Sequence, residues 1–221
     1  MVTTTTHKTL RGPRAGLIFF RKLTGDGQDT GLEARINNAV FPSCQGGPHN
    51  NTIAAIAVAL KQASTEEFKQ YAKTVRENCS ALADRLIAMG HKLVTNGTDN
   101  HLLLWDLRQH SITGSKMEKI CEMVDISINK NSIKDDLSAV TPGGVRIGTA
   151  ALTTRGFKPE DMTKVAELLH ESLHLAIDIQ KQSPSKLLKD FVETAQKSEK
   201  VLWLREQVRT LAKQFPMPGY N

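Results

Sequence analysis

A long amphipathic helix, followed by alternating helical and extended segments, constrains the fold most strongly. Apolar residues recur at helical spacing along one face of this predicted helix: Phe68, Tyr71, Ala72, Val75, Cys79, Leu82 and Leu86. Ser64 and Glu67 form a candidate capping box at its start, and Gly90 is expected to end it. The sequence therefore predicts a helix that buries one face against a core.

The segments after this helix alternate in pattern. "HKLVTNG" and "HLLLWDLR" are typical of strands separated by a turn, while "ISINKN" and "GGVRIGTAAL" indicate strand or loop segments. Ser115 and Glu118 form a second candidate capping box. Pro159 suits the first turn of a helix predicted to reach about Gln180, and further helices are expected beyond Ser183–Pro184. This alternation predicts an α/β fold.

The front of the chain has a different organisation. "GLIFFRK", residues 16–22, is predicted to be a buried strand, but turn-rich loops follow it and a helix begins only near Ile53. A lone pair of strands is not independently stable. We therefore expect this part to be a slice of a sheet whose other strands are missing.

Composition narrows the class of function. The net charge of +6 is spread along the chain and aromatic residues make up only 5%, which argues against nucleic-acid binding. Cys44, Cys79 and Cys121 form no CxxC pair, which suggests a reducing compartment. No apolar stretch is long enough to suggest a membrane span. The basic, threonine-rich opening leaves a disordered tail, a transit peptide or part of an active site open.

Short motifs contain residue types suited to chemistry. Lys8 is a candidate Schiff-base former because burial and neighbouring arginines favour a neutral amine; it is otherwise a solvated lysine. The pair Gly46–Gly47 before a helix suits a phosphate site or an ordinary loop. Arg146 suits bidentate binding of a carboxylate, or a surface salt bridge.

Several segments together resemble the latter half of serine hydroxymethyltransferases, from Val2 to about Gly219. They are, in order, "VTTTTHKTLRGPRAGLIFF", "AVFPSCQGGPHNNTIAAIAVALKQA", "GTDNHLLLWDLR", "INKNS" and "TPGGVRIGTAALTTRGF". The resemblance implies an incomplete aminotransferase-like fold, known as fold type I. Residues 1–63 would be a remnant of the large domain that binds pyridoxal phosphate, with the start of a connecting helix. Residues 64–221 would hold the rest of that helix and a small C-terminal α/β domain.

The resemblance also implies which residues bind the cofactor. Lys8 matches the lysine that forms a Schiff base with pyridoxal 5'-phosphate, His7 matches the histidine beside it, and Arg14 matches an arginine near the cofactor. Gly46 and Gly47 match glycines that reach the cofactor phosphate of a neighbouring subunit across a dimer interface. The opening segment is therefore interpreted as part of an active site.

The implied reaction moves a one-carbon unit between serine and tetrahydrofolate and yields glycine. Arg146 matches the arginine that holds the amino-acid carboxylate, and Phe41 and Asn131 match positions that help to bind folate. A homo-oligomer, dimer or tetramer, and a cytoplasmic location are expected. A segment targeting a mitochondrion or plastid would lie upstream.

The family's other half should supply an aspartate on the pyridine nitrogen, a ring-stacking histidine, further phosphate ligands and a catalytic glutamate. We therefore expect a truncated chain that is weakly active or inactive alone, or a non-catalytic partner that docks on full-length subunits. Mild departures from the family pattern point the same way: Ser43, Asn51, Asp135–Asp136 and Ala150.

A metal-binding pattern also occurs. His170, Glu171 and His174 match HExxH, in which histidines one turn apart bind zinc, and Glu193 is a candidate third ligand. Both histidines lie off the apolar stripe of their predicted helix. A solvent-exposed face explains them, and we expect no metal.

Overall fold

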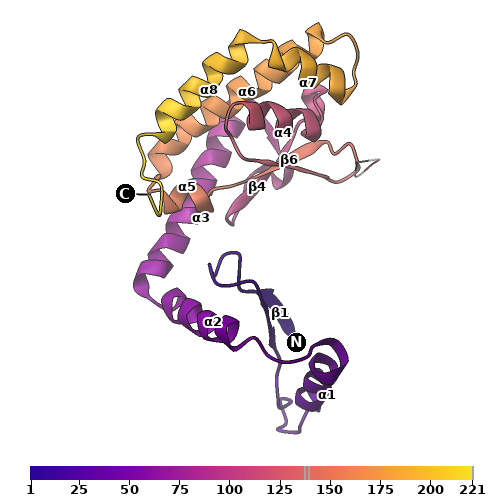
Figure 1. Ribbon diagram of the computed structural model, residues 1–221, viewed down its shortest axis with the longest axis vertical. Coiled ribbons are helices and arrows are strands. Elements are labelled where there is room, and N and C mark those ends of the chain that lie inside the picture. The colour runs from indigo at the N-terminus through magenta and orange to yellow at the C-terminus, as the bar shows by residue number, and fades with distance from the viewer. Residues whose placement is uncertain (137, 139, 221) are drawn as a thin grey trace. The chain divides into compact units, whose positions relative to one another are not determined.

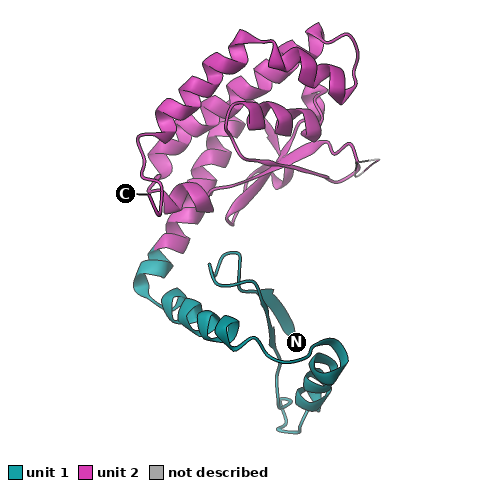
Figure 2. Ribbon diagram, in the orientation of Figure 1, with its two compact units in different colours: residues 1–70 teal, residues 71–221 magenta. Residues whose placement is uncertain are grey.

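Helices and strands alternate along most of the chain in the computed structural model, which describes residues 1–136, 138 and 140–220. The predicted mixed α/β class is confirmed (Figure 1). The chain divides into two units, residues 1–70 (unit 1) and residues 71–221 (unit 2), shown in Figure 2.

Unit 1 begins with a two-stranded antiparallel sheet of β1 (Val2–Thr5) and β2 (Gly16–Phe19). The predicted strand at residues 16–22 is confirmed for its first part, but its predicted burial is wrong. Ile18 is 42% exposed and Phe19 is 55% exposed. The unit continues with α1 (Leu32–Asn38), the π-helix η1 (Ala39–Cys44) and α2 (Asn50–Ala63).

Helix α3 (Glu66–Ala88) carries the predicted apolar stripe, but a different residue caps its start. The Oγ1 of Thr65 accepts a hydrogen bond from the backbone N–H of Phe68 at 3.2 Å. Ser64 instead ends α2, where its hydroxyl donates to a carbonyl of that helix. The predicted capping box of Ser64 and Glu67 is therefore wrong by one residue at the cap.

The predicted cap of α4 (Gly114–Met123) is also wrong, here by two residues. The Oγ1 of Thr113 accepts a hydrogen bond from the backbone N–H of Lys116 at 3.3 Å. Ser115 lies inside the helix and is buried. A threonine in extended conformation is thus the cap, because only a non-helical residue can turn its hydroxyl toward the first free amides.

Unit 2 contains a four-stranded antiparallel sheet in the order β3-β4-β6-β5. Its strands are β3 (Lys92–Leu93), β4 (Leu102–Asp106), β5 (Asn129–Asn131) and β6 (Gly144–Gly148). Trp105, Val145 and Ile147 point to one face and are buried. Residues at alternate positions point to the other face, where Arg146 is exposed; this side is called the open face.

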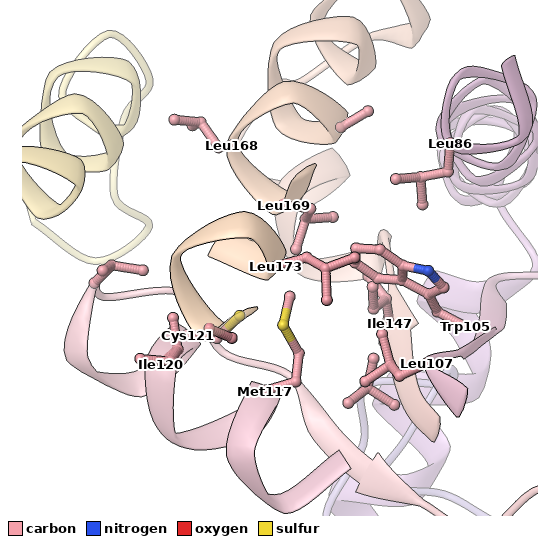
Figure 3. Close-up of a cluster of buried hydrophobic side chains, with 14 of the residues drawn as sticks. Leu86, Trp105, Leu107, Met117, Ile120, Cys121, Ile147, Leu168, Leu169 and Leu173 are labelled. Carbon is pink, nitrogen blue, oxygen red and sulfur yellow. The ribbon is translucent and has the colours of Figure 1, made fainter. Parts of the chain in front are cut away.

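Helices cover the buried face of this sheet and complete the core (Figure 3). Besides α3 and α4, unit 2 contains α5 (Ala150–Thr154), α6 (Met162–Gln182), α7 (Leu188–Gln196) and α8 (Glu199–Ala212). The core includes Leu86, Trp105, Leu107, Met117, Ile120, Cys121, Leu169 and Leu173. Short 3-10 turns link the elements: η2 (Val94–Asn96), η3 (Arg108–His110) and η4 (Pro159–Asp161).

None of the described helices is long and apolar enough to cross a membrane.

A nearly buried carboxylate ties β4 to the residues after it. Asp106 accepts hydrogen bonds from the guanidinium of Arg108 at 2.8 and 3.0 Å, and Lys92 lies 3.5 Å away. The bond from Arg108 is the main cause that lowers the pKa of Asp106 from its ordinary 3.8. The charged carboxylate is therefore favoured in the folded state.

Lowering the pH should remove the stabilisation that the charged Asp106 carboxylate provides. Because the folded-state pKa of Asp106 lies below 3.8, its stabilisation is complete above that pH and is lost as the pH falls through the folded-state value. We expect Asp106→Asn to flatten the fall in the free energy of unfolding as the pH drops below about 4. Urea titrations across this range measure the effect, and an unchanged acid limb would contradict the pairing.

Candidate functional site

A tight loop between β1 and β2 presents Lys8. Thr6 is buried at 1% exposure, and its hydroxyl donates to the carbonyl of Pro13 at 2.6 Å. The carbonyl of Thr6 accepts from the N–H of Gly12 at 2.7 Å, and that of Lys8 accepts from the N–H of Arg11 at 2.9 Å. These bonds fix the loop backbone and leave the Lys8 side chain exposed.

Gly12 allows this loop to pack closely. A Cβ added at Gly12 would lie 2.9 Å from the carbonyl oxygen of Thr6 and 3.0 Å from the Cβ of Ala59 on α2. The guanidinium of Arg11 lies 5.2 Å from the ring centre of Phe68, a cation–π contact. The lysine loop is thus held against the helices of unit 1.

His7 carries an unsatisfied polar atom next to Lys8. The ring is half-buried, and its Nδ1 is buried with no hydrogen-bond partner in the described chain. Such groups are rare in folded proteins unless a ligand or solvent completes them. The position beside Lys8 therefore fits a ligand that supplies a polar group.

A pocket in unit 1 brings several predicted residues together. Arg14, Phe41, Gly46 and Gly47 line it along with parts of β1, β2, α1 and α2. His7 and Lys8 are not among its lining residues and lie on the preceding loop. Both glycines are exposed, and a Cβ at either would meet no atom within 4 Å. Their backbone lies just before the N-terminus of α2, a place that suits an anion such as a phosphate.

The open face of the unit 2 sheet holds the remaining predicted residues. Arg146 is exposed, between the buried Val145 and Ile147. Asn131 on β5 pairs with Gly144 on β6, so its side chain shares a face with Arg146, two residues along β6. An arginine and an amide on one exposed face can bind a carboxylate and a neighbouring polar group.

Asp136 organises the connection between these strands. Its Oδ2 accepts hydrogen bonds from the N–H groups of Ile133 at 2.9 Å and Gly143 at 2.8 Å. From the sequence, Asp136 stands out only as a departure from a family pattern. These partners flank a loop, and no spacing rule in the sequence indicates that they share one carboxylate.

The HExxH histidines belong to a cluster in unit 2. The Nε2 of His91 lies 2.9 Å from the Nδ1 of His170, and the rings of His170 and His174 are 4.3 Å apart between centres. The ring of His110 lies 5.7 Å from that of His91. Burial is the main cause that lowers the pKa of His91 to about 4, and the three neighbouring imidazoles contribute to the same shift. His174 is exposed as expected, but His170 is half-buried.

The candidate third zinc ligand is engaged elsewhere. Glu193 lies on α7, where its carboxylate is 3.9 Å from the ammonium of Lys189. Within the described residues, no three histidine, cysteine, aspartate or glutamate side chains are arranged to hold a metal ion. The structure therefore offers no support for a zinc hydrolase site.

Comparison with known proteins shows which family the chain belongs to. The family model described as serine hydroxymethyltransferase matches residues 1–169. Serine hydroxymethyltransferase 3, chloroplastic, of Arabidopsis thaliana is 49% identical over 99% of this chain and 42% of its own length. The Bombyx mori serine hydroxymethyltransferase is 47% identical over 100% of this chain and 50% of its own length. The cytosolic enzyme of Oryctolagus cuniculus is 48% identical over 99% and 48%, respectively.

These relatives are transferases, and the match covers most of the chain. The chain belongs to the serine hydroxymethyltransferase family. It spans about half the length, or slightly less, of the curated relatives it matches. The resemblance seen in the sequence is confirmed.

Proposed function

We propose that this chain provides the cofactor-lysine and substrate-carboxylate regions of a serine hydroxymethyltransferase. The reaction transfers a one-carbon unit between serine and tetrahydrofolate and yields glycine. The family match over residues 1–169, which contains both Lys8 and Arg146, carries the proposal. The exposure of both side chains supports it, because each is accessible to a ligand.

Lys8 and His7 would hold pyridoxal 5'-phosphate. When bound, this cofactor withdraws electrons from the α-carbon of the amino acid. The amine of Lys8 would attach covalently to the cofactor aldehyde, from a loop whose backbone the Thr6 and Gly12 bonds already fix. The unpartnered Nδ1 of His7 would hydrogen-bond a polar group of the bound cofactor. Because the loop is already fixed, little conformational entropy is lost when the cofactor binds, and this favours its attachment to Lys8.

The anionic end of the cofactor would be bound by backbone and guanidinium groups. Arg14 supplies positive charge in the unit 1 pocket, and Gly46 and Gly47 leave their backbone open beside the start of α2. The resemblance assigns the two glycines to the cofactor of a neighbouring subunit. We therefore propose that the complete site forms between two subunits.

The amino acid and the folate would bind through the other predicted residues. Arg146, exposed on the open sheet face, would grip the carboxylate of serine or glycine with parallel hydrogen bonds. Asn131, on the same face, and Phe41, which is 61% exposed, would contact the folate. Fixing the carboxylate orients the α-carbon, so the position of Arg146 on a strand matters for rate.

Unit 1 exposes more apolar surface than a solvated protein usually leaves open. The exposed side chains are Ile18, Phe19, Leu23, Val40, Phe41, Ile53, Val58 and Leu60. Such surface normally packs against further polypeptide. We therefore propose that residues 1–63 are the remnant of a larger fold type I domain and that the chain acts in an assembly. That assembly is a homo-oligomer or a complex with a full-length subunit, and the chain alone is weakly active or inactive.

The same apolar surface supports a second candidate function, that of a non-catalytic partner of full-length subunits. The two candidate functions differ in whether Lys8 takes part in catalysis. A partner would bind full-length enzyme through unit 1, and its effect would survive Lys8→Ala. A catalytic subunit would lose its contribution in that variant.

The experiment is a tetrahydrofolate-dependent assay of glycine formation from serine with added pyridoxal phosphate. The purified chain is assayed alone and mixed with a full-length family member whose own cofactor lysine is replaced. We expect little activity alone and a gain in the mixture that disappears with Lys8→Ala. A rate typical of complete enzymes from the chain alone would refute weak isolated activity. No gain in the mixture, despite binding, would favour the non-catalytic role.

A cytoplasmic location is also proposed. Cys44, Cys79 and Cys121 are all free thiols, which fits a reducing compartment. The curated relatives include a cytosolic and a chloroplastic enzyme, and plastid or mitochondrial residence remains the alternative. Imaging of a C-terminally tagged product of the native gene distinguishes them.

A further inference from the structure

We propose that His170 and His174 bind a divalent transition-metal ion of the zinc or nickel class, with His91 holding the His170 ring in place. The proposal concerns unit 2 and does not rest on the proposed function. It rests on how helix α6 and the loop after α3 bring these imidazoles together.

The two proposed ligands have the spacing that metal ions use on helices. Residues four apart lie on one helix face, and the rings of His170 and His174 are 4.3 Å apart between centres, at 61° to each other. Imidazole nitrogens suit zinc, nickel and copper. His174 is exposed and His170 is half-buried, so an ion can enter from solvent and be held at the protein surface.

His91 provides the support that a ligating histidine needs. A metal-binding imidazole commonly uses its other ring nitrogen to donate a hydrogen bond, which fixes its tautomer and orientation. The Nδ1 of His170 lies 2.9 Å from the Nε2 of His91, a hydrogen bond in which either ring can donate. Metal binding selects the arrangement in which His170 donates and its Nε2 keeps a free lone pair. His91 is only 6% exposed and is therefore firmly placed.

The other groups around the pair limit what the site can do. His110 is engaged with Gln109, whose side-chain nitrogen lies 2.9 Å from its Nε2. Glu193 pairs with Lys189, and the described residues contain no arrangement of three ligands. The ion is therefore held by two imidazoles and completes its coordination with water. A zinc hydrolase site has three protein ligands, so this site binds an ion without hydrolytic chemistry.

The test is calorimetric titration of the tag-free full chain with zinc chloride, repeated with nickel chloride. We expect one ion per chain and no binding of magnesium, which prefers oxygen ligands. His174→Ala removes an exposed ligand and should weaken zinc binding at least about tenfold, while His91→Gln should weaken it about 10–100-fold. Zinc should raise the melting temperature of the wild type, and a chelator should reverse this.

Control variants distinguish zinc binding at this site from nonspecific zinc binding to other exposed histidines. His101→Ala removes an exposed histidine outside the cluster, and Glu171→Gln removes the base of the HExxH pattern; both should keep wild-type zinc affinity. Circular dichroism checks that each variant is folded, and the exposed His174 position keeps the test valid if His91→Gln unfolds. Absence of zinc binding, or an unchanged affinity in His174→Ala, would overturn the proposal.

Discussion

Lys8→Ala is expected to abolish covalent attachment of pyridoxal phosphate to the chain. The amine at this position is the only part of the proposed site that can form a bond with the cofactor aldehyde, and the loop around it is fixed by backbone hydrogen bonds. The measurement is the visible absorbance of lysine-bound cofactor after addition of pyridoxal phosphate, with and without the full-length partner. The loss should be complete.

A matched control is available in the same unit. Lys61→Ala removes an exposed lysine from the last turn of α2 and should leave the absorbance unchanged. Retention of the absorbance in Lys8→Ala would show that another lysine binds the cofactor, and Lys8 would lose its proposed role.

Leu86→Ala is expected to destabilise the chain by about 2–5 kcal/mol. Leu86 is fully buried at the end of α3, within the cluster drawn in Figure 3. Truncation removes apolar contacts and leaves a cavity that the neighbouring helices only partly close. Urea unfolding followed by circular dichroism measures the change in the free energy of unfolding.

The adjacent residue provides the comparison. Ile87 is 40% exposed, so Ile87→Ala should cost well under half as much as Leu86→Ala. Equal effects of the two substitutions would contradict the packing of α3 described above. Such a result would also weaken the assignment of this helix face to the core.

The sequence predicts the periodic elements well because their signals are local. The apolar stripe of α3 and the start at Pro159 of the helical region formed by η4 and α6 follow from spacing and from the fixed backbone angle of proline. Both helix caps are mispredicted: Ser64 lies one residue before the observed cap Thr65, and Ser115 lies two residues after the observed cap Thr113. In each case a threonine stands next to or near the predicted serine, and backbone conformation, not residue type, decides which hydroxyl caps the helix.

Burial is harder to predict than secondary structure. Ile18 and Phe19 are apolar and lie in a strand, yet both are exposed, because burial needs a surface that local sequence does not specify. The contact of His91 with His170 joins residues 79 positions apart. Spacing along α6 identifies His170 and His174 as a pair, but only the fold shows that His91 packs beside them.

The candidate site is predictable only in part for the same reason. Lys8, His7 and Arg146 stand out through motifs that lie within a few residues, and the resemblance supplies their roles. Thr6 and Gly12 fix the loop that carries Lys8, and this depends on a chain reversal that brings Gly12 close to Ala59. The paired amides bound by Asp136 are likewise separated along the chain.

Reductive trapping shows most directly whether Lys8 binds the cofactor. The chain is incubated with pyridoxal phosphate, with and without the full-length partner, treated with borohydride and digested for peptide mass spectrometry. We expect a cofactor adduct on Lys8 and on no other lysine to a comparable extent. An unmodified Lys8 under both conditions, or an adduct spread evenly over exposed lysines, would contradict this expectation.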